Sequence, residues 1–122
     1  MSTRVLFDTN ILIDCLSGVP SAHAEIGRYK DEAISVITWM EVMAGTTPAD
    51  EAKTRAYLMN FLNIPITPAI ADRAVVIRRG KHLKLPDAII LATAEVEGRL
   101  LITRNTRDFS ADEPGVRIPY QI

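Results

Sequence analysis

The chain has 122 residues, of which 48% are hydrophobic, so it is long enough to form one domain with a sizeable buried core. Its 14 Lys and Arg residues nearly balance its 15 Asp and Glu residues, and the formal net charge is -1. This balance excludes a protein that attracts nucleic acid through its overall charge. Any such binding must use a local basic patch.

The cysteine content and the apolar runs indicate the cellular compartment of the protein. Cys15 is the single cysteine and cannot form an internal disulfide, which favours a reducing compartment and a structural thiol. No apolar run approaches membrane-spanning length, and the first residues lead into a strand rather than into a signal-peptide core. We expect a cytoplasmic protein.

Strand and helix patterns alternate in the first half of the chain. A short apolar strand is predicted from Arg4 to Phe7, and apolar residues at helical spacing predict a helix from Thr9 to Leu16. A second helix is expected from a Ser21 cap to about Lys30. A β-branched run then predicts a strand from Ala33 to Ile37, followed by a helix from Thr38 to Ala44.

The second half is predicted to contain three helices and three short strands. Each helix opens at a proline: Pro48 to about Leu62, Pro68 to about Gly80, and Pro86 to about Glu97. The strands are expected at Ile64 to Thr67, Arg99 to Thr103 and Val116 to Ile118. This order predicts a single α/β domain over residues 1–122 with a short, mostly parallel central sheet.

Four acids lie where apolar elements begin or end. Asp8 ends the first strand, Glu41 lies just past the second, and Asp108 follows the strand that ends near Thr103. Sites in parallel sheets lie beyond the carboxyl ends of the strands, so these three are expected at one edge. Asp87 opens the helix that leads into that last strand, and it reaches the same edge only if the start of its helix packs there.

Each of these acids also has an ordinary structural explanation. Asp8 can cap the helix that begins at Thr9, and Asp87 is a first-turn acid that the helix dipole favours. Glu41 stands in a very apolar segment, where an Arg partner would serve as well as a metal ion. Asp108 lies in a polar loop, where an exposed acid needs no partner. The convergence of all four at one edge favours a shared site over four separate explanations.

The remaining acids lie in polar stretches, on helix faces or in turns, where solvated charge is expected. Asp14 follows Asp8 on the same helix and is also expected to be exposed. The others are Glu25, Asp31, Glu32, Asp50, Glu51, Asp72, Glu95, Glu97, Asp112 and Glu113.

Converging carboxylates suit a divalent cation. Hard cations such as Mg²⁺ prefer carboxylate oxygens and keep open positions for water and phosphate, which suits phosphoryl chemistry. His23 and His82 have no partner at metal-ligand spacing, so surface roles are expected for both.

Four motifs carry a family resemblance: FDTNILID, the T-x-x-E of Thr38 to Glu41, LPDAIILATA and TRNTRDF. In this order and at these distances they resemble the PIN domain, and more narrowly the VapC toxins of toxin–antitoxin pairs. The resemblance covers essentially the whole chain. By position, Asp8, Glu41, Asp87 and Asp108 match the acidic quartet of the family, and its polar companions match Thr9, Asn10, Thr38 and Asn105.

The resemblance implies a three-layer α/β/α fold and an endoribonuclease that depends on Mg²⁺ or Mn²⁺. It further implies inhibition by a small VapB-like antitoxin and a homodimer within the toxin–antitoxin complex. We assign Asp8 and Asp87 as the primary metal ligands. Glu41 and Asp108 would complete the acidic pocket, through water, through a second ion or by activating the attacking water.

Contacts to the RNA substrate must come from local clusters of positive charge, since the whole chain is near neutral. One cluster runs into the segment that carries Asp87, and the other flanks Asn105. The candidate RNA-binding residues are Arg78, Arg79, Lys81, Lys84, Arg104 and Arg107.

Three alternatives compete with a ribonuclease. A phosphatase of the haloacid dehalogenase class also begins with a strand-terminal Asp, but it needs a second Asp where this chain has Asn10. A catalytically silent PIN-like module would bind protein or RNA without cutting. A nuclease directed at DNA is the third, because acids and metal do not distinguish the sugar.

Overall fold

The computed structural model describes residues 3–122, which form a parallel sheet covered by helices. The five strands are β1 Arg4–Phe7, β2 Asp31–Ser35, β3 Leu62–Ile64, β4 Leu100–Ile102 and β5 Val116–Arg117. The six helices are α1 Thr9–Leu16, α2 Pro20–Ile26, α3 Val36–Ala44, α4 Glu51–Leu58, α5 Pro68–Lys81 and α6 Leu85–Glu97. None of the helices in this part of the chain has the length and apolar character needed to cross a bilayer.

The sheet has the strand order β3-β2-β1-β4-β5, and every neighbouring pair is parallel. The first strand is therefore central: Leu6 pairs with Ala33 on one side and with Leu101 on the other. All three residues are fully buried. Strands that are covered on both faces read as continuous apolar runs, which is the pattern that predicted them.

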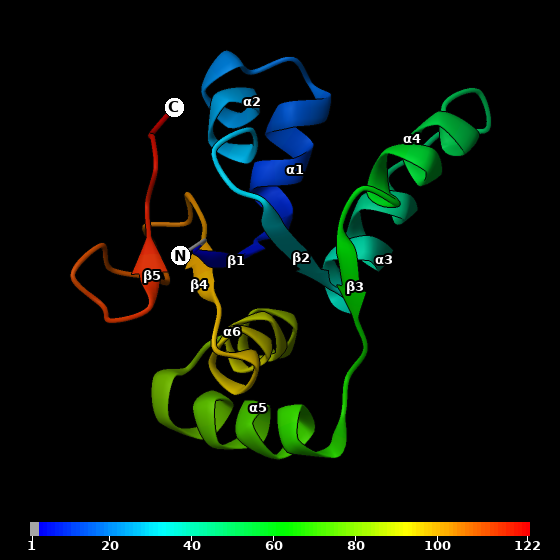
Figure 1. Cartoon of the computed structure of the whole chain (residues 1–122). Coiled ribbons are helices and arrows are strands. Elements are labelled where there is room, and N and C mark those ends of the chain that lie inside the picture. The colour runs from blue at the N-terminus through cyan, green and yellow to red at the C-terminus, as the bar shows by residue number, and fades with distance from the viewer. Residues whose placement is uncertain (1–2) are drawn as a thin grey trace.

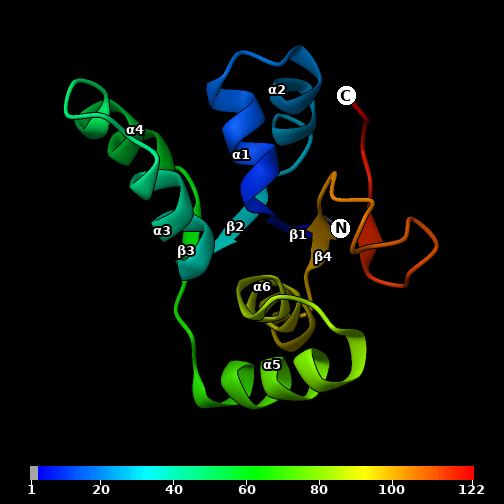
Figure 2. The same ribbon diagram turned by 180° about the vertical axis from the view of Figure 1, so that it is seen from behind.

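Successive side chains of each strand enter two separate cores. Leu6 and Leu101 pack against α5 and α6, whereas Val5 and Phe7 pack against helices on the opposite face. The two views of the ribbon show α5 and α6 on one side of the sheet and α1 and α2 on the other, with α3 and α4 beside β3 (Figures 1 and 2). The three-layer α/β/α arrangement predicted from the sequence is confirmed.

The second strand was predicted two residues too late. It spans Asp31–Ser35, and Val36 and Ile37 belong to α3 although they are β-branched. The reason is a helix cap: the Ser35 hydroxyl accepts the Ile37 N–H at 3.1 Å. This cap starts α3 early, which puts Thr38 in the first turn and Glu41 in the second.

The bounds of α4, β3 and α2 also differ from the sequence prediction. The helix expected from Pro48 is shorter, since α4 covers only Glu51–Leu58 and β3 begins at Leu62 rather than at Ile64. Helix α2 begins at Pro20 and is preceded by Val19 without any side-chain cap, so Ser21 is not the cap residue. Pro at the first helical position supplies a suitable backbone angle without a capping side chain.

The topology directs four segments to the carboxyl edge of the sheet. The chain leaves β1, β2 and β4 at this edge, where Asp8, α3 and residues 103–108 follow. Helix α6 returns the chain to the start of β4 through the left-handed Gly98, so the helix runs antiparallel to the strands. Its first turn, with Asp87, therefore lies at the carboxyl edge.

Candidate active site

Asp8 lies between the end of β1 and the start of α1, and its side chain is only 4% exposed. The carboxylate accepts the Thr9 N–H at 2.7 Å, so it caps α1 as an ordinary N-cap residue does. Its other oxygen accepts the Thr103 hydroxyl at 2.7 Å and the Asn10 amide at 3.3 Å. Capping of α1 accounts for the position of Oδ1 only, because Oδ2 is bonded to Thr103, which follows β4.

Burial raises the pKa of the Asp8 carboxyl to about 6, against the hydrogen bonds from Thr103 and Thr9, which lower it. The negative charges of Asp87 and Glu41 raise this pKa further. Carboxylates affect one another in this way only when they lie near each other in a poorly solvated region. The structure thus brings Asp8, Glu41 and Asp87 together at the sheet edge.

Glu41 projects from α3 toward the same edge and is exposed. The Thr9 hydroxyl donates to Glu41 Oε1 at 2.6 Å, and the Thr9 and Thr38 hydroxyl oxygens lie 3.1 Å apart. Among residues 3–122 no Lys or Arg forms an ion pair with Glu41, so the alternative of an Arg partner is not observed. The two threonines link the start of α1 to the carboxylate on α3.

Asp87 stands in the first turn of α6, directly after Pro86. Partial burial raises its pKa above the ordinary value, and the charges of Asp108 and Glu41 raise it further against Lys84, which lowers it. A first-turn acid stabilised only by a helix dipole would have a lowered pKa. Asp87 is therefore more than a first-turn acid, because it is partly buried and has Asp108 and Glu41 as like-charged neighbours.

Asp108 lies in the segment of residues 103–108 that follows β4, here called the 103–108 loop. The Asn105 amide donates to Asp108 Oδ2 at 2.9 Å, and the Asp108 N–H donates to Asn105 Oδ1 at 3.3 Å. The Asn105 N–H in turn donates to the Thr103 hydroxyl at 3.1 Å. Asp108 is exposed, and its position depends on this reciprocal pair with Asn105.

An open cavity of about 500 Å³ lies between the start of α6 and the 103–108 loop. Its lining combines acids with amide and basic side chains, a mixture suited to a phosphate group with a cation. His82, for which a surface role was expected, lines this cavity from the left-handed end of α5, where its φ is 56°. The lining residues are Asn10, His82, Lys84, Asp87, Arg104, Asn105, Thr106, Arg107 and Asp108.

The candidate RNA-binding residues divide into two groups. Lys84, Arg104 and Arg107 line the cavity, whereas Arg78, Arg79 and Lys81 are exposed in the last turns of α5. Lys81 forms an ion pair with Glu113. The Nε and Nη2 groups of Arg104 already donate to the Asp14 carboxylate, so they are not free to bind a phosphate. The sequence could not reveal these partners, because they lie far away along the chain.

Two acids expected to be exposed are buried, and that expectation was wrong. Asp14 is 5% exposed and binds Arg104, and Glu25 is 4% exposed and binds Arg117. In both cases burial disfavours the charged carboxyl, but hydrogen bonds from arginine and tyrosine outweigh it and lower the pKa. Glu32 differs, because one of its oxygens is buried without a hydrogen-bond partner among residues 3–122 and burial raises its pKa to about 7.

The carboxylates around Asp8 fit a hydrated divalent cation. Within residues 3–122 no group of three or more His, Cys, Asp or Glu side chains is arranged to enclose a metal ion. Mg²⁺ does not require such a cage, since it keeps several waters and is commonly held by one or two carboxylates together with substrate phosphate. Asp8 and Asp87 could each offer a carboxylate oxygen, and a cation would neutralise the charges whose burial and mutual repulsion raise the pKa of both groups.

The family model described as the PIN domain matches residues 5–112 of this chain. The chain belongs to the PIN-domain family. Ribonuclease VapC10 from Mycobacterium tuberculosis is 32% identical in an alignment 113 residues long, which covers 86% of this chain and 85% of that protein. The resemblance to VapC proteins predicted from the four motifs is confirmed.

Solved structures of related PIN domains superpose on this one along nearly its full length. A chain in a toxin-antitoxin complex from Klebsiella pneumoniae is 51% identical, with a TM-score of 0.92 and coverage of 97% of this chain and 99% of that chain. FitAcB from Neisseria gonorrhoeae is 24% identical, with a TM-score of 0.78 and the same coverage, and supports the fold alone.

Proposed function

We propose that this PIN domain is an endoribonuclease dependent on Mg²⁺ or Mn²⁺ and the toxin of a toxin–antitoxin pair in the cytoplasm. The observation that carries the proposal is the gathering of carboxylates around the buried Asp8 at the sheet edge, where Glu41 is linked to the start of α1 through the Thr9 hydroxyl and Asp87 lines the cavity beside Asp108. The 32% identity to a ribonuclease supports the reaction, and the 51% identity to a chain of a toxin-antitoxin complex supports the biological role.

Asp8 and Asp87 would hold the cation, which when bound neutralises phosphate charge and lowers the pKa of a bound water. The protein contributes orientation. Thr103 and Asn10 fix one Asp8 oxygen by hydrogen bonds at 2.7 and 3.3 Å, while the Thr9 N–H fixes the other. The Asp8 carboxylate is thereby held in one direction before any substrate arrives.

Glu41 is assigned to the proton of the attacking water. It is exposed to solvent, and the Thr9 hydroxyl, which donates to its Oε1 at 2.6 Å, orients it. Asp108 lines the same cavity as Asp87, and the Asn105 amide, which donates to its Oδ2 at 2.9 Å, orients it. It would bind a second ion or a water in the cation's shell. No Ser, Cys or His nucleophile is needed in this scheme.

RNA would approach over the cavity rim. Lys84 and Arg107 line the cavity without an ion pair among the described residues, so both are available for phosphate. Arg78 and Arg79 extend the positive charge along α5. Because the net charge of the whole chain is only -1, the affinity for RNA would come from these local basic residues.

The activity is tested by cleavage of a structured RNA with Mg²⁺, with Mn²⁺ and with excess EDTA. Asp8→Asn and Asp87→Asn should each reduce the rate by roughly a hundredfold or more, because a neutral amide is a weaker ligand of similar shape. Asp72→Asn changes an exposed acid on α5 and serves as the matched control with a rate near wild type. Full cleavage in EDTA would exclude the proposed chemistry, and RNA binding without cleavage would favour the silent module.

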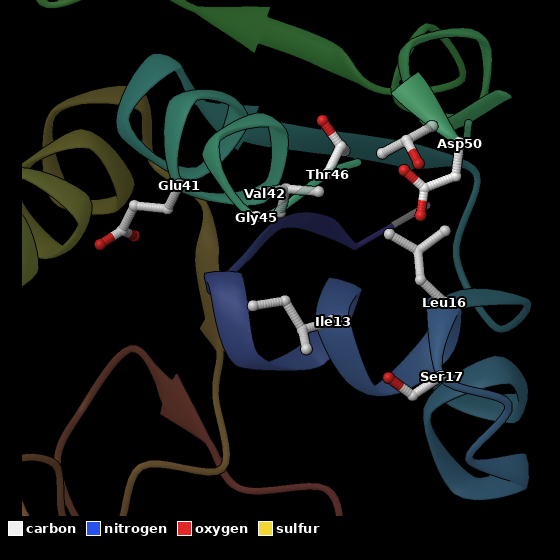
Figure 3. A pocket seen from close by; sticks show the side chains of 9 residues that line it. Ile13, Leu16, Ser17, Glu41, Val42, Gly45, Thr46 and Asp50 are labelled. Atoms are coloured by element: carbon white, nitrogen blue, oxygen red, sulfur yellow. The ribbon is translucent and has the colours of Figure 1, made fainter. Parts of the chain in front are cut away.

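The antitoxin would bind along an apolar groove beside the acids. This groove has a volume of about 340 Å³ and runs between α1 and the segment from α3 to α4. Ile13 and Leu16 remain 45% and 43% exposed along it, and Glu41 lies at the end opposite Leu16 and Asp50 (Figure 3). An amphipathic helix could cover this surface and extend a basic side chain to the acids.

A homodimer within the toxin–antitoxin complex is part of the proposal. Apolar side chains remain exposed on α5 and α6, with Val76 at 55% and Leu85 at 50%, and a second copy could cover them. Sedimentation of the free protein and of its complex with the antitoxin would give the stoichiometry of each. A monomeric toxin in both samples would exclude the dimer.

A further inference from the structure

A second carboxylate on α1 ties distant parts of the chain together. Asp14 accepts two hydrogen bonds from the Arg104 guanidinium, from Nε at 2.5 Å and from Nη2 at 3.0 Å. The Tyr120 hydroxyl donates to the same carboxylate at 2.8 Å. Asp14 is 5% exposed, so its charge is largely removed from water and depends on these two partners.

This ion pair is continuous with the hydrogen bonds that orient the acids. The Arg104 N–H donates to Asn10 Oδ1 at 3.2 Å, and the Asn10 amide donates to Asp8 at 3.3 Å and to Thr103 at 3.3 Å. Arg104 directly precedes Asn105, which holds Asp108. The backbone of the 103–108 loop is therefore bound to α1 at Asn10 and again, through the Arg104 side chain, at Asp14.

We propose that Asp14 and Tyr120 are positioning residues for the nuclease reaction, which act through Arg104 to hold the 103–108 loop over the acidic site. This inference rests on the proposed ribonuclease function. The two-pronged pair of arginine and carboxylate fixes direction as well as distance. Asp108 is exposed and is held by Asn105 and by the buried Phe109 that follows it, so its place relative to Asp8 also depends on how firmly the start of the loop is held at Arg104.

A different role for Arg104 predicts effects of opposite sign. If Arg104 left Asp14 to bind an RNA phosphate, the neutral variant Asp14→Asn would release the guanidinium and tighten RNA binding. The salt dependence of binding would then become steeper by about one phosphate contact. If Arg104 is a tether, Asp14→Asn leaves RNA binding nearly unchanged and reduces the rate of the chemical step.

The chain contains a matched control in a second buried carboxylate. Glu25 accepts the Arg117 guanidinium at 2.8 and 3.1 Å and the Tyr29 hydroxyl at 2.7 Å, and it is 4% exposed. Glu25 also accepts a hydrogen bond from Arg28 at 3.2 Å, so its cluster has one more arginine than that of Asp14 but similar burial, and it also ties the C-terminal part of the chain to the α1–α2 region. Among the described residues its side chains make no hydrogen bond with the 103–108 loop.

The experiment compares Asp14→Asn with Glu25→Gln in the full-length protein. Both variants lose one buried charge, and thermal unfolding first establishes a temperature at which both remain folded. Asp14→Asn should lower kcat for RNA cleavage by roughly 10- to 100-fold while KM and RNA affinity stay within about twofold. Glu25→Gln should keep a kcat near wild type. Tyr120→Phe and Tyr29→Phe form a milder pair, in which only Tyr120→Phe should lower kcat.

Hydrogen exchange gives a measure that does not depend on activity. The amide protons of Asp108 and Phe109 are bonded to Asn105, at 3.3 and 3.1 Å, and that of Arg104 to Asn10. A peptide covering residues 104–109 should exchange faster in Asp14→Asn than in Glu25→Gln. Equal exchange in the two variants, equal loss of kcat, or tighter RNA binding by Asp14→Asn would overturn the proposal. If wild type cleaves no RNA with Mg²⁺, the ribonuclease assignment fails, while exchange still decides the tether.

Discussion

Asp8→Asn should stabilise the metal-free protein, although it removes the best-ordered carboxylate of the site. In the folded chain the pKa of Asp8 is raised to about 6, whereas an unfolded Asp titrates near about 3.9. At about pH 7 the difference corresponds to roughly 3 kcal/mol by which the charged form opposes folding. The hydrogen bonds from Thr103 and Thr9 are already included in that pKa.

The amide variant keeps the shape of the site and much of its local bonding. Asn caps helices as well as Asp does, so the bond from the Thr9 N–H should persist. The Thr103 hydroxyl would then donate to a neutral oxygen, which weakens that bond. The expected net gain in unfolding free energy is about 1–3 kcal/mol, or roughly 4–12 °C in Tm for a domain of this size.

The sign of the pH dependence follows from the raised pKa. Below about pH 4 the carboxyl is protonated in both states and contributes nothing. As the pH rises from about 4 to about 6, the unfolded state ionises first, so stability falls, and above about 6 the penalty is constant. The advantage of Asp8→Asn should therefore be largest near pH 7 and shrink to about half near pH 5.

Thermal unfolding in EDTA and in Mg²⁺ measures these effects. Wild type should gain stability from Mg²⁺, and Asp8→Asn should gain much less, because a cation relieves the same repulsion that the amide removes. Asp72→Asn is the control for loss of one negative charge and should change stability by less than about 0.5 kcal/mol. If Asp8→Asn were destabilising in EDTA, and Mg²⁺ did not stabilise wild type, Asp8 would be a helix cap and no more.

Two further predictions concern the partner and a buried acid outside the site. If a basic side chain of the antitoxin pairs with Asp8 and Asp87, saturating Mg²⁺ should measurably weaken antitoxin binding in a calorimetric titration. An antitoxin affinity that changes neither with Mg²⁺ nor in Asp8→Asn would show that the antitoxin binds at another surface. Glu32→Gln should raise Tm at about pH 8 and progressively less toward pH 5, because burial raises the Glu32 pKa to about 7; a variant less stable than wild type at about pH 8 would show that the ionised carboxylate is stabilising.

The site was accessible to sequence reasoning because its residues mark the ends of strands. Asp8 follows an apolar strand directly, and Glu41 and Asp108 follow two others, so topology alone brought them to one edge. Asp87 needed one more step, since the turn at Gly98 sets the direction of α6. Local patterns were sufficient for these residues because the site is built from chain segments whose order in the sheet is regular.

The buried ion pairs were not accessible in the same way. Asp14 and Arg104 are 90 residues apart in sequence, and Glu25 and Arg117 are 92 apart. Asp14 stands between Ile13 and Cys15, and Glu25 between Ala24 and Ile26, and none of these neighbours indicates the distant arginine that each carboxylate binds. The start of α3 was missed for the converse reason, since a single bond from the Ile37 N–H to Ser35 overrides the β-propensity of two residues.

The central place of β1 also has a consequence for synthesis of the chain. This strand is made first, yet one of its two neighbours is β4, and Asp8 takes a hydrogen bond from Thr103 just beyond it. The acids cannot be assembled until residues 100–108 have left the ribosome, and Tyr120 closes the last contact with α1. On the proposed function, the nascent domain stays inactive while residues 100–108 are still inside the ribosome, so its activity begins only after this segment has emerged and paired with β1.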